Sequence, residues 1–153
     1  MVVKLILFVL PLNSKRIIMR TQIYDLMYPL INNGSGIYEV DDLAAYIDKL
    51  LKRACIISIT DQDVLQGFLA YYANDPDKQV GFLSMLVVSP SAQRMGYGRR
   101  MVEFCLTDMV LKGYKICRTE VKENNMMAIN ICKRTGFSLV EKKDKYLVME
   151  KLL

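Results

Sequence analysis

The sequence predicts an α/β protein of the mixed (α+β) kind, with a central β-sheet flanked by about four helices. Apolar runs of strand length alternate along the chain with stretches whose apolar residues recur at helical spacing. The run Val80–Val88 is apolar throughout, which is typical of a strand buried on both faces. A chain of 153 residues has the size of one domain, and no repeat or linker divides it. We therefore expect residues 1–153 to form a single domain.

The first predicted element is a strand at Leu5–Leu10, a short apolar run after Lys4. The run is too short to span a bilayer, and it lacks the small-residue cleavage pattern of a signal peptide. An upstream extension is the main alternative, because Met19 could itself be an initiator. In that case Met1–Ile18 would be an accessory tail.

Two helices are predicted next from apolar residues at helical spacing. The first, Thr21–Ile31, ends at the glycine-containing loop Asn32–Gly36. The second is capped by Asp41 or Asp42 and runs to about Arg53.

Three strands and a helix should follow. Cys55–Ile59 and Leu65–Tyr72 form a hairpin, and Val80–Val88 is the next strand. The helix after Gly98 stops at Gly113, which suits a left-handed cap.

The last predicted elements are a strand, a helix and a hairpin. The strand is Lys115–Val121, and the helix is Met126–Thr135, capped by Asn124 or Asn125. The hairpin consists of two strands around a charged turn, namely Phe137–Val140 and Lys145–Leu152 around Glu141–Asp144.

Composition excludes several classes of function. The chain has no histidine, so histidine-based catalysis is excluded, and we predict no metal site. Its four cysteines show no CxxC spacing and are expected to be reduced core thiols in a cytoplasmic protein. No basic run is interleaved with aromatic residues, which disfavours nucleic acid as a partner. No segment predicts binding to a membrane.

The net charge of +5 lies in the second half of the chain. Residues 1–80 carry 8 Lys+Arg against 9 Asp+Glu, whereas residues 81–153 carry 13 against 7. A basic half favours a polyanionic ligand.

A glycine-containing turn, Gln93–Gly98 (QRMGYG), lies between the strand Val80–Val88 and the next helix. Glycines let the backbone approach an anion closely, and the free N–H groups of a first helical turn point at it. The turn is not a Walker loop, which needs GKS or GKT after its last glycine. It also differs from the dinucleotide fingerprint, because Met101 stands where a glycine is required. The turn therefore predicts a phosphate site of another kind.

A second motif covers Glu120–Phe137 and agrees with the first. With both motifs, the chain resembles the GNAT superfamily of N-acetyltransferases over about Ser58 to Leu153, whereas residues 1–57 match only in layout. Five positions of the second motif match the family pattern: Glu120, Asn125, Ala128, Gly136 and Phe137.

The resemblance implies the GNAT fold, with its fourth and fifth strands splayed apart, and acetyl-CoA as co-substrate. The turn would wrap the pyrophosphate through Arg94, Met95, Gly96, Tyr97, Gly98 and Arg99. The pantetheine arm would run along Leu86, Val87 and Val88, with an N–H near Val87 or Val88 polarising the thioester carbonyl. Asn125 would hold an amide of the cofactor, cap its helix, or do both.

Two residues are the catalytic candidates that the resemblance implies. Glu120 would be the general base that takes a proton from the ammonium form of the acceptor, unless it is only a surface glutamate. Cys132 stands where the family usually has a tyrosine that protonates the departing sulfur. We favour a packing role for Cys132, because a cysteine side chain is much shorter than that of tyrosine.

The predicted function is therefore N-acetylation by direct attack of an amine on acetyl-CoA. The acceptor pocket is expected between the first two helices and the final hairpin, with Tyr38, Tyr71 and Tyr72 as contacts. These residues favour a small polar amine, such as an amino sugar or amino acid derivative. Two alternatives stay open: acetylation of a protein or peptide amine, and a non-catalytic acyl-CoA-binding module. The sequence leaves open whether the protein is a homodimer.

Overall fold

The structure, a computed structural model, describes residues 4–8 and 13–153, and the side chains from residue 14 onward. The strands are β1 (Lys4–Phe8), β2 (Cys55–Asp61), β3 (Val64–Tyr72), β4 (Val80–Val88), β5 (Ile116–Lys122), β6 (Ser138–Lys143) and β7 (Tyr146–Leu152). The helices are α1 (Asn13–Ile31), α2 (Leu43–Arg53), α3 (Tyr97–Leu111) and α4 (Met126–Arg134). A short 3-10 turn, Pro90–Ala92, precedes α3. The predicted order of elements is confirmed.

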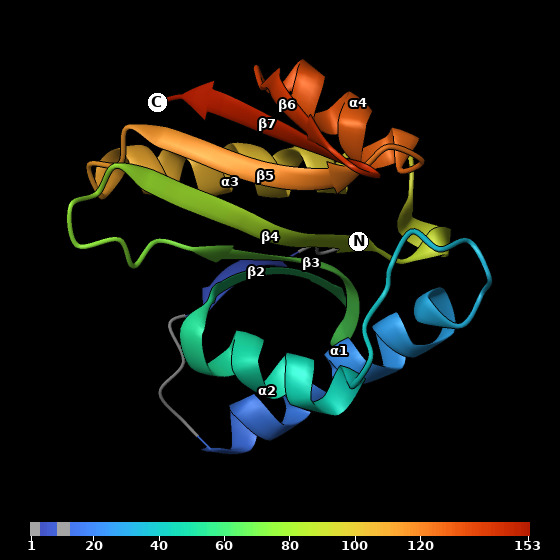
Figure 1. The fold of residues 1–153 in the computed structure, drawn as a ribbon. Coiled ribbons are helices and arrows are strands. Elements are labelled where there is room, and N and C mark those ends of the chain that lie inside the picture. Colours follow the sequence, from blue (N-terminus) through green and yellow to red (C-terminus); the bar gives the residue numbers. More distant parts are fainter. Residues whose placement is uncertain (1–3, 9–12) are drawn as a thin grey trace.

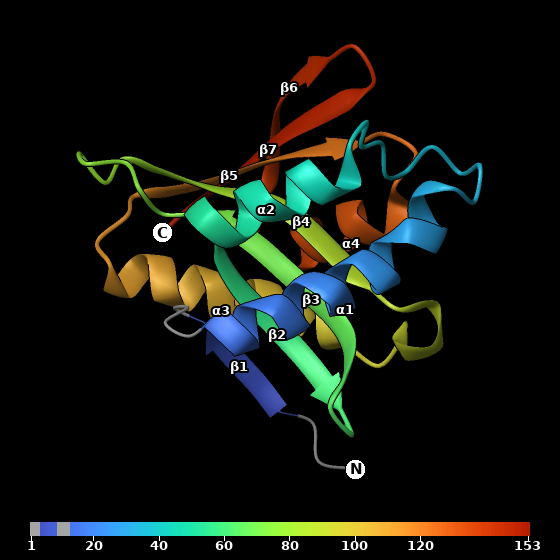
Figure 2. The same cartoon turned by 90° about the horizontal axis from the view of Figure 1, so that it is seen from below.

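The strands form one seven-stranded sheet in the order β1-β2-β3-β4-β5-β7-β6. Neighbouring strands are antiparallel except β4 and β5, which run parallel, so the sheet is mixed as predicted. Figures 1 and 2 show α1 and α2 against one face of the sheet, with α3 and α4 against the other. None of the helices in the described part of the chain is long and apolar enough to cross a membrane.

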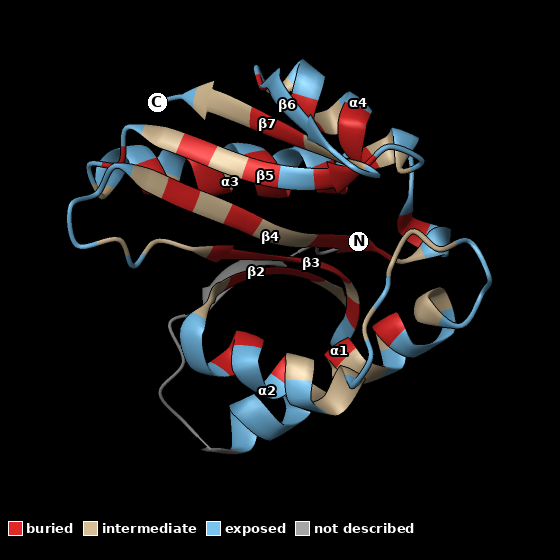
Figure 3. Cartoon of the chain, in the orientation of Figure 1, coloured by how far each residue is buried: buried red, intermediate tan, exposed pale blue. Residues whose placement is uncertain are grey.

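Each face of the sheet carries its own core, and β3 contributes to both. Phe68 and Ala70 point to the α1/α2 face, whereas Leu69 and Tyr71 point to the α3/α4 face, as alternation along a strand requires. All four are fully buried, and Figure 3 shows β3 as a largely buried strand in the middle of the molecule. Burial of each large apolar side chain contributes about 1.5–3 kcal/mol relative to leaving it exposed. This double core places β3 at the buried centre of the fold.

Strand β4 contains a bulge at Ser84. Its register with β3 shifts there, since Met85 faces Ala70 while Leu83 already faces Tyr71. Ser84 is thus an extra residue on β4, and such a bulge bends the strand that carries it. The bulge lies where β4 begins to leave β5.

Strands β4 and β5 separate after a short parallel ladder. Their pairing starts at Val80 with Ile116 and ends at Leu83 with Thr119. At this last pair the Thr119 hydroxyl donates to the Leu83 carbonyl over 2.9 Å. The splay that the family resemblance implies is therefore present, and it leaves the edge of β4 after Leu83 unpaired on this side.

The N-terminal segment differs in part from the prediction. Strand β1 pairs antiparallel with β2, with Lys4 opposite Thr60, while Val9 and Leu10 of the predicted strand lie outside the described residues. Helix α1 begins at Asn13 and not at Thr21. Residues 13–18 are therefore part of this helix.

The early start of α1 leaves little trace in the sequence, and the reason is physical. The apolar residues of the first turns, Ile17 and Ile18, are exposed and do not belong to the stripe that packs α1 against the sheet. The sequence therefore shows no apolar stripe at helical spacing in these turns. Only every fourth residue, Met19, Ile23 and Met27, is buried against the sheet. Such a narrow stripe is enough to pack the helix but too weak to predict its start.

The final hairpin is longer than predicted. Strand β6 continues to Lys143, and the turn is formed by Asp144 and Lys145 rather than by Glu141–Asp144. Every residue of β6 is exposed, so its charged residues face water without breaking the strand. Asp144 takes the left-handed conformation with φ of 50°, which suits a tight hairpin turn.

Candidate active site

The glycine-containing turn places unpaired backbone donors at the start of α3. Gly96 is the N-cap with φ of 80°, and its carbonyl accepts the first helical bond from Arg100 N–H over 3.1 Å. The N–H groups of Tyr97, Gly98 and Arg99 precede that bond and have no acceptor within the helix. Together with the positive end of the helix dipole, they form a site for an anion.

The two glycines of the turn have different roles. A side chain at Gly96 would meet nothing within 4 Å, so its backbone is open to a ligand. A Cβ at Gly98 would lie 2.8 Å from Ile131 Cδ1, so this glycine lets α4 pack closely against α3. Gly96 is therefore the residue at which a substitution disturbs binding without disturbing the packing of α4.

A cavity of about 720 Å³ lies at this turn and is bounded on its other side by α4. Three arginines line it, Arg94, Arg99 and Arg134, and none of its described lining residues is acidic. Arg99 is also paired with Glu103, with 2.7 Å between Nε and Oε1. The predicted Gly96, Tyr97 and Gly98 line the cavity, whereas Met95 is half-exposed beside it. The positive charge of the lining residues and the open backbone at Gly96 both suit a pyrophosphate.

The part of this cavity that α4 supplies was not predicted from the sequence. Four residues of one face of the helix line it, namely Met127, Asn130, Ile131 and Arg134. Their spacing of three and four residues, on the side of the helix away from its buried residues, is a signal that could have identified them.

Strand β4 offers backbone groups to the splay at alternate residues. Ser89 N–H donates to the Gln66 carbonyl of β3 over 2.7 Å, which makes this a hydrogen-bonded pair. By alternation, Val87 bonds to β3, and Leu86 and Val88 turn their N–H and carbonyl groups away from it, into the splay. Leu86 and Val88 rather than Val87 are therefore placed to polarise a carbonyl and to bond a polar arm. The Val87 side chain is fully buried on the α1/α2 face.

A second cavity, of about 310 Å³, lies in the splay itself. Residues from both faces of the sheet line it, so the cavity passes between β4 and β5. From the α1/α2 side come Ile37, Tyr38, Glu39, Met85, Glu120, Lys122 and Tyr146, and from the α3/α4 side Leu86, Val102, Ala128 and Cys132. Two reactants that enter from opposite faces can meet here.

Glu120 enters this cavity from β5, next to the last paired residue, Thr119. Among the described residues, no ion pair engages its carboxylate. The other carboxylate of the cavity, Glu39, contacts Lys122 at 2.8 Å and Lys145 at 2.9 Å. These two lysines lower the pKa of Glu39, which keeps it ionised and engaged. Of the two carboxylates, Glu120 is thus the one without an ion-pair partner among the described residues.

Two hydrogen bonds hold the loop between α1 and α2 at the end of β5. Lys122, only 7% exposed, donates from Nζ to the Gly36 carbonyl over 2.5 Å. Asn124 donates to the Ser35 carbonyl over 3.3 Å. Lys122, Glu39 and Tyr146 were not predicted from the sequence, because contacts between residues so far apart in the chain leave no periodic pattern.

The three predicted tyrosine contacts have different places in the structure. Tyr38 lines the splay cavity, and its hydroxyl donates to the Leu86 carbonyl over 3.0 Å. The expectation for Tyr71 and Tyr72 needs correction, since neither lines this cavity. Tyr71 is fully buried on the α3 face, where it bonds to Asp108 over 2.5 Å. Tyr72 packs partly buried against the α1/α2 core.

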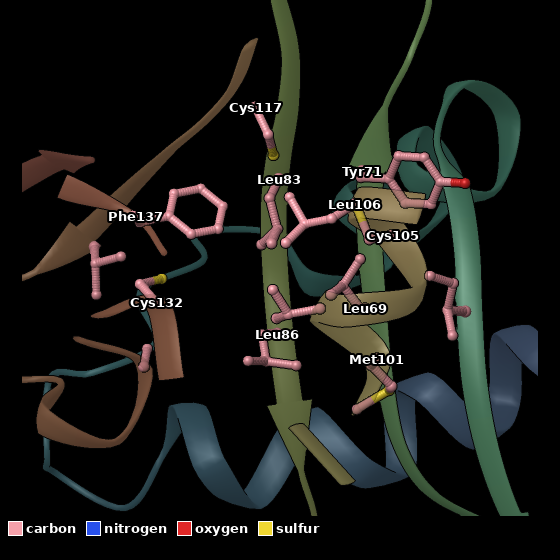
Figure 4. Close-up of a cluster of buried hydrophobic side chains, with 14 of the residues drawn as sticks. Leu69, Tyr71, Leu83, Leu86, Met101, Cys105, Leu106, Cys117, Cys132 and Phe137 are labelled. Carbon is pink, nitrogen blue, oxygen red and sulfur yellow. The ribbon is translucent and has the colours of Figure 1, made fainter. Parts of the chain in front are cut away.

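Cys132 lines the splay cavity but packs as a core residue. It is 4% exposed, and burial raises the pKa of its thiol to about 12. Figure 4 shows it beside Phe137 on one side of β4, with Tyr71 on the other side beyond Leu106. At neutral pH the thiol therefore keeps its proton.

Asn125 is the N-cap of α4, and its side-chain oxygen accepts from the Ala128 N–H over 3.2 Å. The same residue also lines the splay cavity. Its side-chain N–H₂ group is a donor that the cap does not use. Capping is thus observed, and a contact to the cofactor stays a prediction.

Fold and site together define an acyl-CoA-dependent transferase. Residues 21–137 match the model of the acetyltransferase (GNAT) family, and the chain belongs to this family. It is an N-acetyltransferase that uses acetyl-CoA as co-substrate.

Solved structures with low sequence identity show the same fold. An N-acetyltransferase, PaiA, from Thermoplasma acidophilum in complex with coenzyme A is 18% identical, with a TM-score of 0.71 and 100% of both chains covered. An aminoglycoside 6'-acetyltransferase type Ii is 17% identical, with a TM-score of 0.77 and coverage of 99% of this chain and 97% of that one. Ard1 from Thermoplasma volcanium is 16% identical, with a TM-score of 0.75 and the same coverage. Among curated proteins, none matches the sequence.

The role of Cys132 can be tested by Cys132→Ala. If the residue only packs, the variant loses about 1–2 kcal/mol of stability, because a small buried side chain is removed, and keeps turnover within a few-fold. Unfolding and acetyl-CoA turnover are measured on the same preparation, with Cys105→Ala, another buried cysteine, as the control. A stable variant with a large loss of turnover would show that the thiol takes part in the reaction.

Proposed function

We propose that the protein transfers the acetyl group of acetyl-CoA to the primary amine of a small polar acceptor, such as an amino sugar or amino acid derivative. One observation carries this proposal: the cavity between β4 and β5 joins the free edge of β4 to the Glu120 carboxylate. The acceptor enters from the α1/α2 side and attacks the thioester directly.

Each step of the proposed reaction is assigned to a chemical group of this protein. Glu120 takes the proton that the acceptor's ammonium must lose before its nitrogen can attack, either directly or through a water. A backbone N–H of Leu86 or Val88 donates to the carbonyl oxygen, on which negative charge develops. The N–H groups of Tyr97, Gly98 and Arg99 bind the pyrophosphate and hold the thioester in place.

The surroundings of the cavity favour a small acceptor over a polymer. Glu39, in the loop before α2, forms an ion pair with Lys145 in the β6–β7 turn and thus bridges the opening between them. An extended peptide would have to cross this bridge. The carboxylates Glu39 and Glu120 are balanced by Lys122 and Lys145, which gives no acidic trench for a polycation. The likeness to an aminoglycoside 6'-acetyltransferase agrees with an amino-sugar acceptor, although it shows the fold alone.

The proposal is tested by thiol release from acetyl-CoA across a panel of amines. The panel contains amino sugars, amino acid derivatives, polyamines and peptides with a free amino terminus or lysine. We expect turnover with one or more of the small polar amines and less with the peptides. Preferential turnover of peptides would favour the protein or peptide alternative, and tight binding of acetyl-CoA without turnover of any amine would favour a binding module.

The variant Glu39→Gln tests the bridge within the same panel. Because the lysines lower the pKa of Glu39, the ion pairs contribute to stability at neutral pH, and this contribution is lost as the pH falls through the lowered pKa. Glutamine removes both pairs at all pH values. The variant should therefore accept larger amines relative to small ones, with its affinity for acetyl-CoA unchanged.

We also propose that the protein acts in the cytoplasm, where its four free cysteines would remain reduced.

A further inference from the structure

We propose that Tyr38 is the acid that protonates the departing sulfur of acetyl-CoA, the role for which the sequence offered only Cys132. The inference rests on the proposed function and adds a catalytic residue to it. The Tyr38 hydroxyl lies in the splay cavity and donates to the Leu86 carbonyl over 3.0 Å. It therefore reaches the edge of β4 along which the thioester would lie.

The position of this hydroxyl relative to the strand is decisive. Leu86 is one of the two residues whose backbone faces the splay, and its N–H and carbonyl lie on the same side of the strand. A thioester whose carbonyl oxygen accepts from this N–H has its sulfur in the neighbourhood of the phenol. An amide N–H of the bound arm can take over the Leu86 carbonyl, and the hydroxyl is then free to turn to the sulfur.

The other donors of the cavity are less well placed. Cys132 comes from α4 and is 4% exposed, and the described hydrogen bonds include none from its thiol. Tyr146 stands on β7, where the ammonium groups of Lys122 and Lys145 lie 5.9 and 6.0 Å from its ring centre. That places Tyr146 with the groups that surround the acceptor. Tyr38 is the cavity tyrosine with a bond to β4.

The protons and electrons of the step balance. The amine nitrogen bonds to the carbonyl carbon, and the C–S bond breaks with its electron pair on sulfur. The Tyr38 hydroxyl gives its proton to that sulfur, and water returns a proton to the phenolate. The proton that the ammonium loses before the attack passes to Glu120 and from there to solvent. Once it has bonded to the carbonyl carbon, the nitrogen is positively charged and gives up a second proton to water, which leaves a neutral amide. Nothing is oxidised or reduced.

Burial in this cavity disfavours the ionised forms of both a phenol and a thiol. Burial raises the pKa of the Tyr38 phenol to about 12, so it keeps its proton at neutral pH. Burial raises the pKa of the Cys132 thiol, in the same cavity, also to about 12. The same burial disfavours an ionised sulfur of the departing CoA in this cavity, which favours its protonation by a neighbouring hydroxyl.

The test is Tyr38→Phe with two acyl donors, acetyl-CoA and its analogue in which an ester oxygen replaces the sulfur. An alkoxide is a much stronger base than a thiolate and depends more on an acid. We expect turnover of acetyl-CoA to fall by about 10²-fold. The oxygen ester should be slowed by a larger factor, while calorimetry shows an unchanged affinity for acetyl-CoA. Equal slowing of both donors, or no slowing, would overturn the assignment, since loss of a positioning contact would affect both alike.

A control and a second measurement accompany this variant. Tyr24→Phe removes a tyrosine hydroxyl on the same α1/α2 side but outside the splay cavity, and it should change the rates with both donors only slightly. In deuterated water the wild type should slow and Tyr38→Phe should lose this dependence, and an unchanged isotope effect would count against the acid.

The failure of this inference can be told from that of the proposed function. Thiol release is measured with the best amine and with water alone, and both reactions need protonation of the sulfur. If the wild type and Tyr38→Phe turn over at equal rates, only the inference is overturned and the proposed function stands. A wild type that is no faster than buffer in either reaction overturns both.

Discussion

The variant Gly96→Asp should bind acetyl-CoA too weakly to detect, whereas the wild type binds it. The backbone at Gly96 is open, since a Cβ added there would have nothing within 4 Å, and the pyrophosphate needs this space. Aspartate would place a side chain and a negative charge there, against the anion that the N–H groups of Tyr97, Gly98 and Arg99 attract. Isothermal calorimetry measures the affinity, and thermal unfolding shows that the variant is folded.

Gly34→Asp is the matched control. Gly34 has φ of 74° against 80° for Gly96, and neither has an atom within 4 Å of an added Cβ. Both substitutions therefore carry a similar backbone strain, but Gly34 lies in the loop before α2, outside the cavity at the start of α3. Gly34→Asp should keep its affinity for acetyl-CoA. Unchanged affinity in folded Gly96→Asp would remove the turn from the cofactor site.

Glu120→Gln is expected to lower turnover by about 10²-fold or more at neutral pH. Glutamine keeps the shape of the side chain but cannot accept a proton from the ammonium group. The defect should shrink as the pH rises toward about 10, where more of the amine is already free. Steady-state rates across this range, with acetyl-CoA saturating, measure the effect.

Glu123→Gln controls for the loss of a negative charge from the same part of the chain. Glu123 is exposed, pairs with Lys142 over 2.6 Å and does not line the splay cavity. Its substitution should leave turnover within a few-fold. If Glu120→Gln kept the wild-type rate at neutral pH, another group or bulk water would be the base.

The order of elements could be predicted because most helices and strands carry their own local signal. Helix α2 has both an apolar stripe and its capping residue, and Asp42 accepts from Ala45 N–H over 2.9 Å. The start of α1 gave no such signal, because only the sparse positions Met19, Ile23 and Met27 are buried. Whether a segment with so narrow a stripe forms a helix depends on the sheet that it packs against. The local sequence holds no information about that sheet.

The site could be predicted where it depends on one continuous segment. The turn at Gly96 lies within such a segment, and its strand-to-helix context is visible in the sequence. Which residues of β4 face the splay depends on the register with β3. All three of Leu86, Val87 and Val88 were expected along the cofactor, and the register turns the backbone of Leu86 and Val88 toward the splay and that of Val87 toward β3. The contact of Tyr38 with Leu86 and that of Lys122 with Gly36 join segments that are distant in the sequence. Residue spacing could therefore not predict them.

The central claim is that acetyl-CoA lies across the start of α3 and along the free edge of β4, with its thioester in the splay. A crystal structure with acetyl-CoA tests this most directly. We predict the pyrophosphate on the N–H groups of Tyr97, Gly98 and Arg99, the arm beside Val88 and Leu86, and the acetyl group in the cavity that Glu120 lines. A cofactor bound away from α3, or an arm that leaves the splay empty, would contradict the account.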